Sequence, residues 1–144
     1  MKPPRQRLSS EVIKRGYSDE EIAHLYELAR FSLETGETRR AELIATGLVE
    51  VAPEFEPGWL CLATVHLHGR AYEAAIGAAK QAHQLNPDSV VALLLLVTAS
   101  LATGDYNSAG TFLGEVGERI DAGAVEDQNA LRFYRAQLAR FQAR

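Results

Sequence analysis

The 144-residue sequence contains a single cysteine, Cys61, so no second thiol is present for an internal disulfide. Nothing in the sequence therefore favours an oxidising compartment. The most apolar run, VVALLLLVTASLA at residues 90–102, ends well short of the roughly 20 residues that a membrane helix needs. The basic N-terminus lacks the apolar stretch of a signal peptide. These absences predict a cytoplasmic protein without membrane insertion, and they raise the question of what covers the apolar run.

Residues for catalysis are equally scarce. The sequence has no glycine-rich phosphate loop, because the lysine in IGAAK lacks the glycine spacing. His66 and His68 lie two residues apart, which on a helix turns their side chains about 200° from each other, so one metal ion cannot easily bind both. Cys61 lies between two leucines without an identifiable activating base. We therefore expect no enzymatic activity, no cofactor and no metal.

The charge is unevenly distributed along the chain. The net charge is −4, but residues 1–16 and residues 128–144 each carry +4, which leaves −12 on the residues between them. An acidic middle disfavours binding along a nucleic-acid backbone, so we expect no nucleic-acid partner. The basic ends are interpreted as a solvated arm and a solvated helix face, and binding to an anionic surface is the alternative.

A period of 34 residues organises the chain. Ala41, Ala75 and Ala109 have this spacing, and so do Pro53 and Pro87. Further positions with the same period are Leu28, Leu62 and Leu96; Leu25, Trp59 and Leu93; and Tyr72 and Tyr106. Such self-similarity predicts an all-α solenoid of helix-turn-helix repeats. The helices are expected at about residues 19–35, 38–51, 56–68, 72–85, 89–103 and 106–120.

Local signals support these helices. Ser18 and Glu21 fit a capping box, and either Asp88 or Ser89 suits the start of the helix that contains the apolar run. Gly36 and Gly104 fit turns that need a left-handed backbone. The alanines of the 34-residue series are small enough to let paired helices approach closely.

The two ends of the chain differ from the repeats. Residues 1–17 are interpreted as a basic arm with a short leading helix, and residues 18–144 as the repeat domain, with units at about 22–55, 56–89 and 90–121. A capping helix is expected at about 126–143. Its apolar stripe, which would lie over the third unit, consists of Leu131, Tyr134, Leu138 and Phe141. The stripe of the leading helix consists of Leu8, Val12 and Ile13.

These residues resemble the tetratricopeptide repeat family, and the second unit matches best through Trp59, Leu62, Ala63, Tyr72, Ala75, Ala82 and Pro87. The resemblance implies three stacked repeats in a right-handed α-solenoid. The first helix of each repeat would then line a concave groove. The family's groove positions correspond here to Ala23, Tyr26, Arg30, Leu33, Glu34, Pro57, Leu60, Thr64, Leu67, His68, Val91, Leu94, Thr98, Leu101 and Ala102. The candidate peptide-binding residues among them are Tyr26, Arg30, Leu33, Leu60, Thr64, Leu67, His68, Val91, Leu94, Thr98 and Leu101.

A groove with so many apolar residues predicts a protein partner. Leaving such side chains exposed to water forfeits roughly 1.5–3 kcal/mol each, so the expected ligand is a client peptide with hydrophobic anchors. The polar groove residues would fix the backbone of this peptide. The alternative is that the N-terminal arm, the C-terminal helix or a second copy in a homodimer fills the groove.

The chain also resembles the bacterial type III secretion chaperones that hold hydrophobic translocator proteins. The resemblance is carried chiefly by LYELA at residues 25–29, by Trp59-Leu60 and by YEAAI at residues 72–76. It implies a holding function without chemistry. The alternative hypothesis is a scaffold or assembly subunit of a multiprotein complex that uses the same repeat surface.

Overall fold

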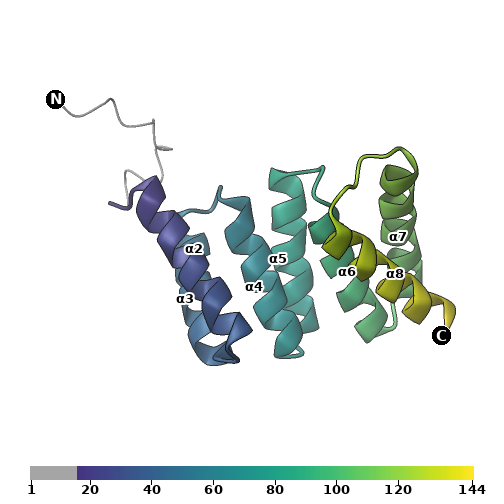
Figure 1. Ribbon diagram of the computed structural model, residues 1–144. Helices are drawn as coiled ribbons and strands as arrows, with labels where there is room; N and C mark the ends of the chain where they lie inside the picture. Colours follow the sequence, from purple (N-terminus) through teal and green to yellow (C-terminus); the bar gives the residue numbers. More distant parts are fainter. Residues whose placement is uncertain (1–15) are drawn as a thin grey trace.

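The computed structural model describes residues 16–144, and all regular secondary structure in this range is helical (Figure 1). The leading helix expected within residues 1–17 falls almost entirely outside the described residues. The helices are α2 (Asp19–Glu34), α3 (Thr38–Val51), α4 (Glu56–His68), α5 (Tyr72–Leu85), α6 (Val90–Thr103), α7 (Tyr106–Asp121) and α8 (Gln128–Gln142). The expected all-α fold is confirmed.

The helix starts and turns have the local causes that the sequence predicts. Ser18 and Glu21 form a reciprocal capping box at α2, with both hydrogen bonds at 3.1 Å. Of the two candidate caps for α6, Ser89 takes this role, because its hydroxyl oxygen accepts a hydrogen bond from the Ala92 N–H. Gly36 and Gly104 have φ angles of 81° and 80° in the turns of the first and third helix pairs, a conformation that favours glycine.

The turn between α4 and α5 has the same backbone conformation without a glycine. Arg70 lies 34 residues from both Gly36 and Gly104, and its φ angle is 58°. An L-residue with a Cβ atom pays a steric cost in this region. The repeat thus preserves the turn geometry at a position where the residue type has changed.

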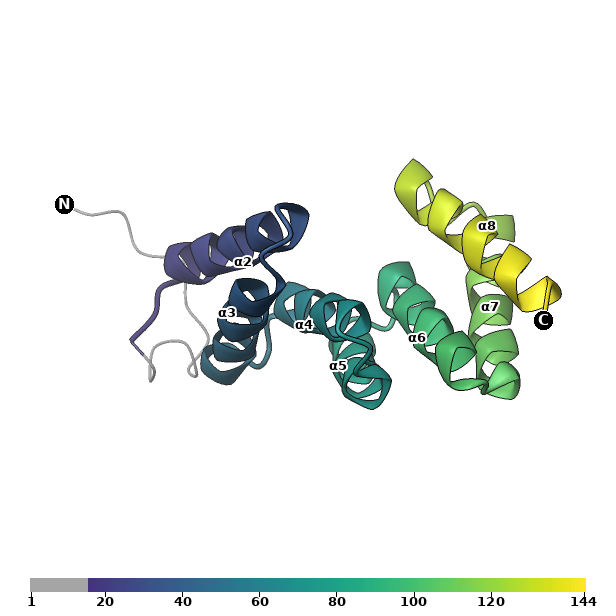
Figure 2. The same cartoon turned by 90° about the horizontal axis from the view of Figure 1, so that it is seen from below.

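Three helix pairs stack side by side. Each helix from α2 to α7 contacts the next, and α2 also contacts α4, which in turn contacts α6. The first helices of the pairs therefore form a continuous layer (Figure 2). Ala41, Ala75 and Ala109 are at most 1% exposed, as expected for small residues where paired helices approach closely.

Helix α8 closes the end of the stack. It packs on both α6 and α7, and Figure 2 shows it on the same side of the array as α2. Its residues Tyr134, Leu138 and Phe141 pack against a core cluster of Val97, Ala109 and Leu113. The expected capping helix and three members of its apolar stripe are thus in the expected place.

The apolar run of residues 90–102 is largely covered by the protein itself. In α6, eight residues are buried: Ala92, Leu93, Leu94, Leu95, Leu96, Val97, Ala99 and Ser100. This helix contacts α4, α5, α7 and α8, so neighbouring helices enclose it on several sides. What remains uncovered is one narrow stripe, which opens into the site described next.

Candidate peptide-binding groove

A hollow of about 440 Å³ lies where α4, α6 and α8 meet. Its floor is the exposed stripe of α6, its walls come from α4 and α8, and the first residue of α5 closes one edge. The lining residues are Thr64, Leu67, His68, Tyr72, Val91, Leu95, Thr98, Ala102, Phe133 and Arg140. We call this hollow the inner groove.

Helical spacing explains which residues of α6 form the floor. Val91, Leu95, Thr98 and Ala102 follow an i, i+4, i+7, i+11 pattern and therefore share one helix face. Val91 is 37% exposed, whereas Leu95 is 5% exposed. An incoming apolar side chain would contact Leu95, whose side chain is already almost fully removed from water.

The two threonines of the groove are equivalent positions of successive repeats, 34 residues apart. The Thr64 hydroxyl donates to the Leu60 carbonyl at 2.9 Å, and the Thr98 hydroxyl donates to the Leu94 carbonyl at 2.8 Å. Because each hydroxyl uses its only proton within its own helix, it offers a ligand an acceptor and a methyl group but no donor. If these threonines form hydrogen bonds with a peptide, their hydroxyl oxygens must therefore act as acceptors and a peptide N–H must donate.

Leu94, an expected groove residue, does not line the inner groove. Leu94 is 0% exposed and belongs to the core cluster against which Phe133 and Tyr134 of α8 pack. Leu101 is half-buried, packs against the cluster of Val97 and contributes to a neighbouring hollow instead. Helix α8 packs on α6, and on this helix Leu95, rather than Leu94, lines the inner groove.

The expected groove residues of the first repeat, and Leu60 of the second, do not line the inner groove. Tyr26, Leu33 and Leu60 are half-buried and pack against the core. Arg30 forms ion pairs with Glu27 at 3.4 Å and Glu34 at 3.7 Å, and its guanidinium lies 5.7 Å from the centre of the Tyr26 ring. The structure thus gathers Thr64, Leu67, His68, Val91, Thr98 and Ala102 at the groove, and the other expected residues do not line it. A role for any of them in peptide binding stays a prediction.

Four groove residues escaped the sequence analysis: Tyr72, Leu95, Phe133 and Arg140. Phe133 lies directly beside Tyr134, and it could have been found by asking which side of an amphipathic capping helix faces α6. Leu95 was hidden within an apolar run, where periodicity carries little information. Arg140 required knowledge of the angle at which α8 crosses the stack.

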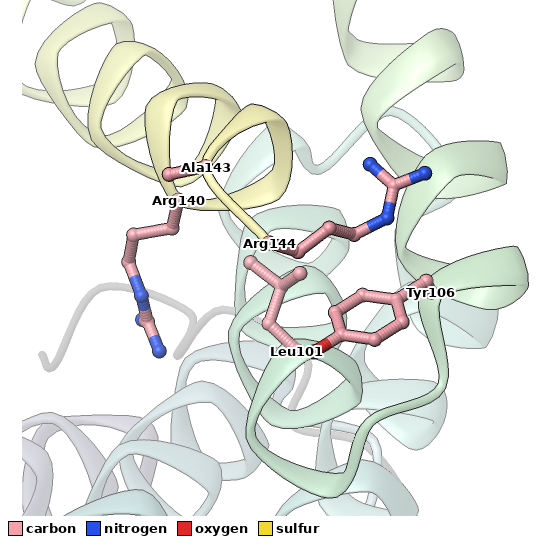
Figure 3. A pocket seen from close by; sticks show the side chains of 5 residues that line it. All are labelled: Leu101, Tyr106, Arg140, Ala143 and Arg144. Atoms are coloured by element: carbon pink, nitrogen blue, oxygen red, sulfur yellow. The ribbon is translucent and has the colours of Figure 1, made fainter.

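Helix α8 supplies the arginine that lines the groove, Arg140. Arg140 Nη1 donates to Gln137 Oε1 at 3.1 Å, and no carboxylate lines the groove. Beyond Arg140 lies a second hollow of about 280 Å³, lined by Leu101, Tyr106, Arg140, Ala143 and Arg144 (Figure 3). The Arg144 guanidinium lies 4.1 Å from the centre of the Phe141 ring and 5.3 Å from that of Tyr106.

The described part of the chain offers little for catalysis. Burial raises the pKa of the Cys61 thiol to about 11, so at neutral pH the thiol stays protonated and is a poor nucleophile. Among residues 16–144, no group of three metal-ligating side chains is positioned to hold an ion. Within the same residues, no helix has both the length and the apolar character needed to cross a membrane.

Comparisons with known proteins agree with this architecture. A tetratricopeptide repeat family model matches residues 67–125. The type III secretion translocator chaperone SycD of Yersinia enterocolitica superimposes with a TM-score of 0.80 at 14% identity, over 96% of this chain and 100% of SycD. PcrH, solved with the chaperone-binding region of PopD, gives a TM-score of 0.76 at 18% identity over 89% and 93% of the two chains.

A tandem tetratricopeptide domain of yeast Sti1, solved in a complex with pHSP90, gives a TM-score of 0.76 at 19% identity, over 87% of this chain and 48% of that one. No curated protein matches the sequence. The matched repeat model and the shared architecture show that the chain has the tetratricopeptide repeat fold. Within that fold, it resembles the type III secretion translocator chaperones.

Proposed function

We propose that this protein is a non-catalytic chaperone that holds an apolar peptide segment of a client in the inner groove. The observation that carries the proposal is the open stripe of α6, where Val91 and Leu95 flank a hollow without carboxylates. Two of the similar structures contain a bound segment of another protein: SycD with a peptide of the translocator YopD, and PcrH with the chaperone-binding region of PopD. By analogy, the client is a hydrophobic translocator that is held in the bacterial cytoplasm until export, with a homodimer as the resting form.

A few apolar side chains of a peptide supply enough free energy for binding. Each fully buried aliphatic side chain contributes roughly 1.5–3 kcal/mol, and ordering the peptide offsets part of this gain. Two or three anchors in a hollow of about 440 Å³ therefore support binding that is tight enough to hold a client and weak enough to release it. The polar contacts would come from peptide N–H groups donating to Thr64 and Thr98.

The proposal is tested with a library of random 12-residue peptides selected on the immobilised full chain. Val91→Glu places a charge on the groove floor near the start of α6, where the helix dipole accommodates a carboxylate. Thr111→Glu is the matched control, because Thr111 is exposed on α7 and does not line the groove. We expect apolar peptides to bind the native chain and the control equally, and Val91→Glu about tenfold more weakly, since one apolar contact is lost. Equal binding to all three proteins would refute a role for the groove.

A further inference from the structure

We infer that the inner groove selects peptides with an acidic side chain beside their apolar anchors, and that this acid binds Arg140 at the α8 end. The inference rests on the proposed function, and it adds a charge requirement and a direction to it. The ligand class is thus an apolar segment with an Asp or Glu on one flank, oriented with that residue toward α8.

Arg30 on α2 and Arg140 on α8 differ in their partners. Arg30 on α2 is paired with two carboxylates, Glu27 and Glu34, so its charge is already compensated. Arg140 has no ion pair with any residue in the described range 16–144; its hydrogen-bond partner, Gln137, is neutral. Of these two arginines, Arg140 is therefore the one at which a ligand carboxylate would gain a full charge-assisted interaction.

The surroundings of Arg140 reinforce this difference. Residues 128–144 contain four arginines and no acid, and no Asp or Glu lines either hollow that Arg140 borders. A hollow that carries one sign of charge on a low-dielectric wall concentrates the field toward an incoming counter-charge. Nothing within the groove competes with a ligand carboxylate.

A hydrogen bond to a buried side chain also holds the Arg140 guanidinium in position. Gln137 is 7% exposed, and its side-chain oxygen accepts the 3.1 Å hydrogen bond from Arg140 Nη1. Figure 3 shows Arg140 extending away from Tyr106, whereas Arg144 lies beside the Tyr106 ring. The two arginines therefore have different roles. Arg144 stacks on the Tyr106 and Phe141 rings, whereas Arg140 lines the groove and is available to a ligand.

The source of the carboxylate is a side chain within the peptide. Arg140 borders both the inner groove and the second hollow, so a peptide chain that reaches Arg140 from the groove has a second hollow beside it in which to extend. A terminal carboxylate is the competing source, and the design of the library distinguishes the two.

The experiment selects displayed 12-residue peptides that are fused at their C-terminus, so that no terminal carboxylate is present. The proteins are the native full chain, Arg140→Gln and Arg135→Gln. Arg135 is the matched control, because it is an exposed arginine of the same helix that lines neither hollow. The readout is the frequency of Asp and Glu within four residues of the apolar anchors, relative to the unselected library.

We expect acidic residues to be enriched about threefold on the native chain and on Arg135→Gln, as suits a partly screened ion pair. On Arg140→Gln the enrichment should vanish while the apolar anchors persist. A selected peptide, synthesised with an amidated C-terminus, should bind the native chain about threefold more tightly with Asp than with Asn, and the ratio should approach one in 1 M NaCl.

Each failure points to a different claim. If no apolar peptide is enriched on the native chain, the proposed function falls and the charge requirement falls with it. If apolar peptides are selected without acids, or if the acids persist on Arg140→Gln, the groove stands and this inference is overturned. Loss of acids on Arg135→Gln as well would also overturn it, because the effect would then come from the net charge of α8. If the selected peptide bound the native chain only when it was synthesised with a free C-terminus, and not in its amidated form, the carboxylate would come from the other source and this inference would be overturned.

Discussion

The glycines of α7 provide a test of how closely α8 is seated on the stack. Gly114 and Gly110 are both inside the helix, where replacement by alanine gains about 1 kcal/mol of helix propensity. A methyl group at Gly114 would meet no atom within 4 Å, whereas one at Gly110 would lie 3.2 Å from Cζ and 3.5 Å from Cε1 of the Phe141 ring. The Phe141 ring is itself covered by the Arg144 guanidinium, so it cannot move without cost.

We therefore expect Gly114→Ala to raise the free energy of unfolding by about 1 kcal/mol, and Gly110→Ala to raise it by less than about half of that or to lower it. Urea denaturation followed by circular dichroism measures both free energies of unfolding, provided that the substitutions leave the slope of the free energy against urea concentration unchanged. Gly77→Ala in α5, where an added methyl is also free of contacts, controls for propensity alone. Equal stabilisation at all three positions would refute the close packing of α8 on α7.

Three further predictions concern single residues. Arg70→Gly should raise the free energy of unfolding by about 1 kcal/mol in thermal or urea melts, because Arg70 holds a left-handed backbone; a loss of stability would contradict this reasoning. Leu94→Ala should cost about 2–4 kcal/mol and Val91→Ala less than about 1 kcal/mol, because only Leu94 is completely buried; similar costs would restore Leu94 to the groove. Since burial raises the pKa of Cys61 from 9.0 to about 11, the thiol of the unfolded chain ionises first. The stability of the native chain relative to Cys61→Ala should therefore be constant below pH 9 and fall between about pH 9 and pH 11, and a parallel pH dependence of the two proteins would contradict the burial.

Most of the fold could be predicted from the sequence because its causes are local and repeated. The spacing of Ala41, Ala75 and Ala109 marks the helix crossings, and Ser18 identifies the start of α2 by a capping box that closes within three residues. The left-handed turns at Gly36 and Gly104 likewise depend on one residue each. Arg70 is the exception, since only the period, and not its side chain, indicates a left-handed turn at that position.

The site could be predicted less well, because it depends on the packing of elements far apart in the sequence. The repeat register places Leu94 in the groove, but the register describes an open stack and takes no account of α8. In the structure α8 packs on α6, and Leu95 lines the groove in place of Leu94. Leu95 is one residue along the chain and about 100° around the helix. Arg140 reaches the groove for the same reason, and no local signal in its sequence neighbourhood indicates that it does so.

The central claim is that the stripe of α6 between α4 and α8 is the peptide-binding surface. The most direct measurement is a titration of the isotope-labelled 144-residue chain with an apolar peptide from the library, followed by amide chemical shifts. The account predicts that the largest changes cluster at Thr64, Leu67, Val91, Leu95 and Thr98. Changes concentrated on the outer faces of α3, α5 and α7, with the α6 stripe unaffected, would contradict it.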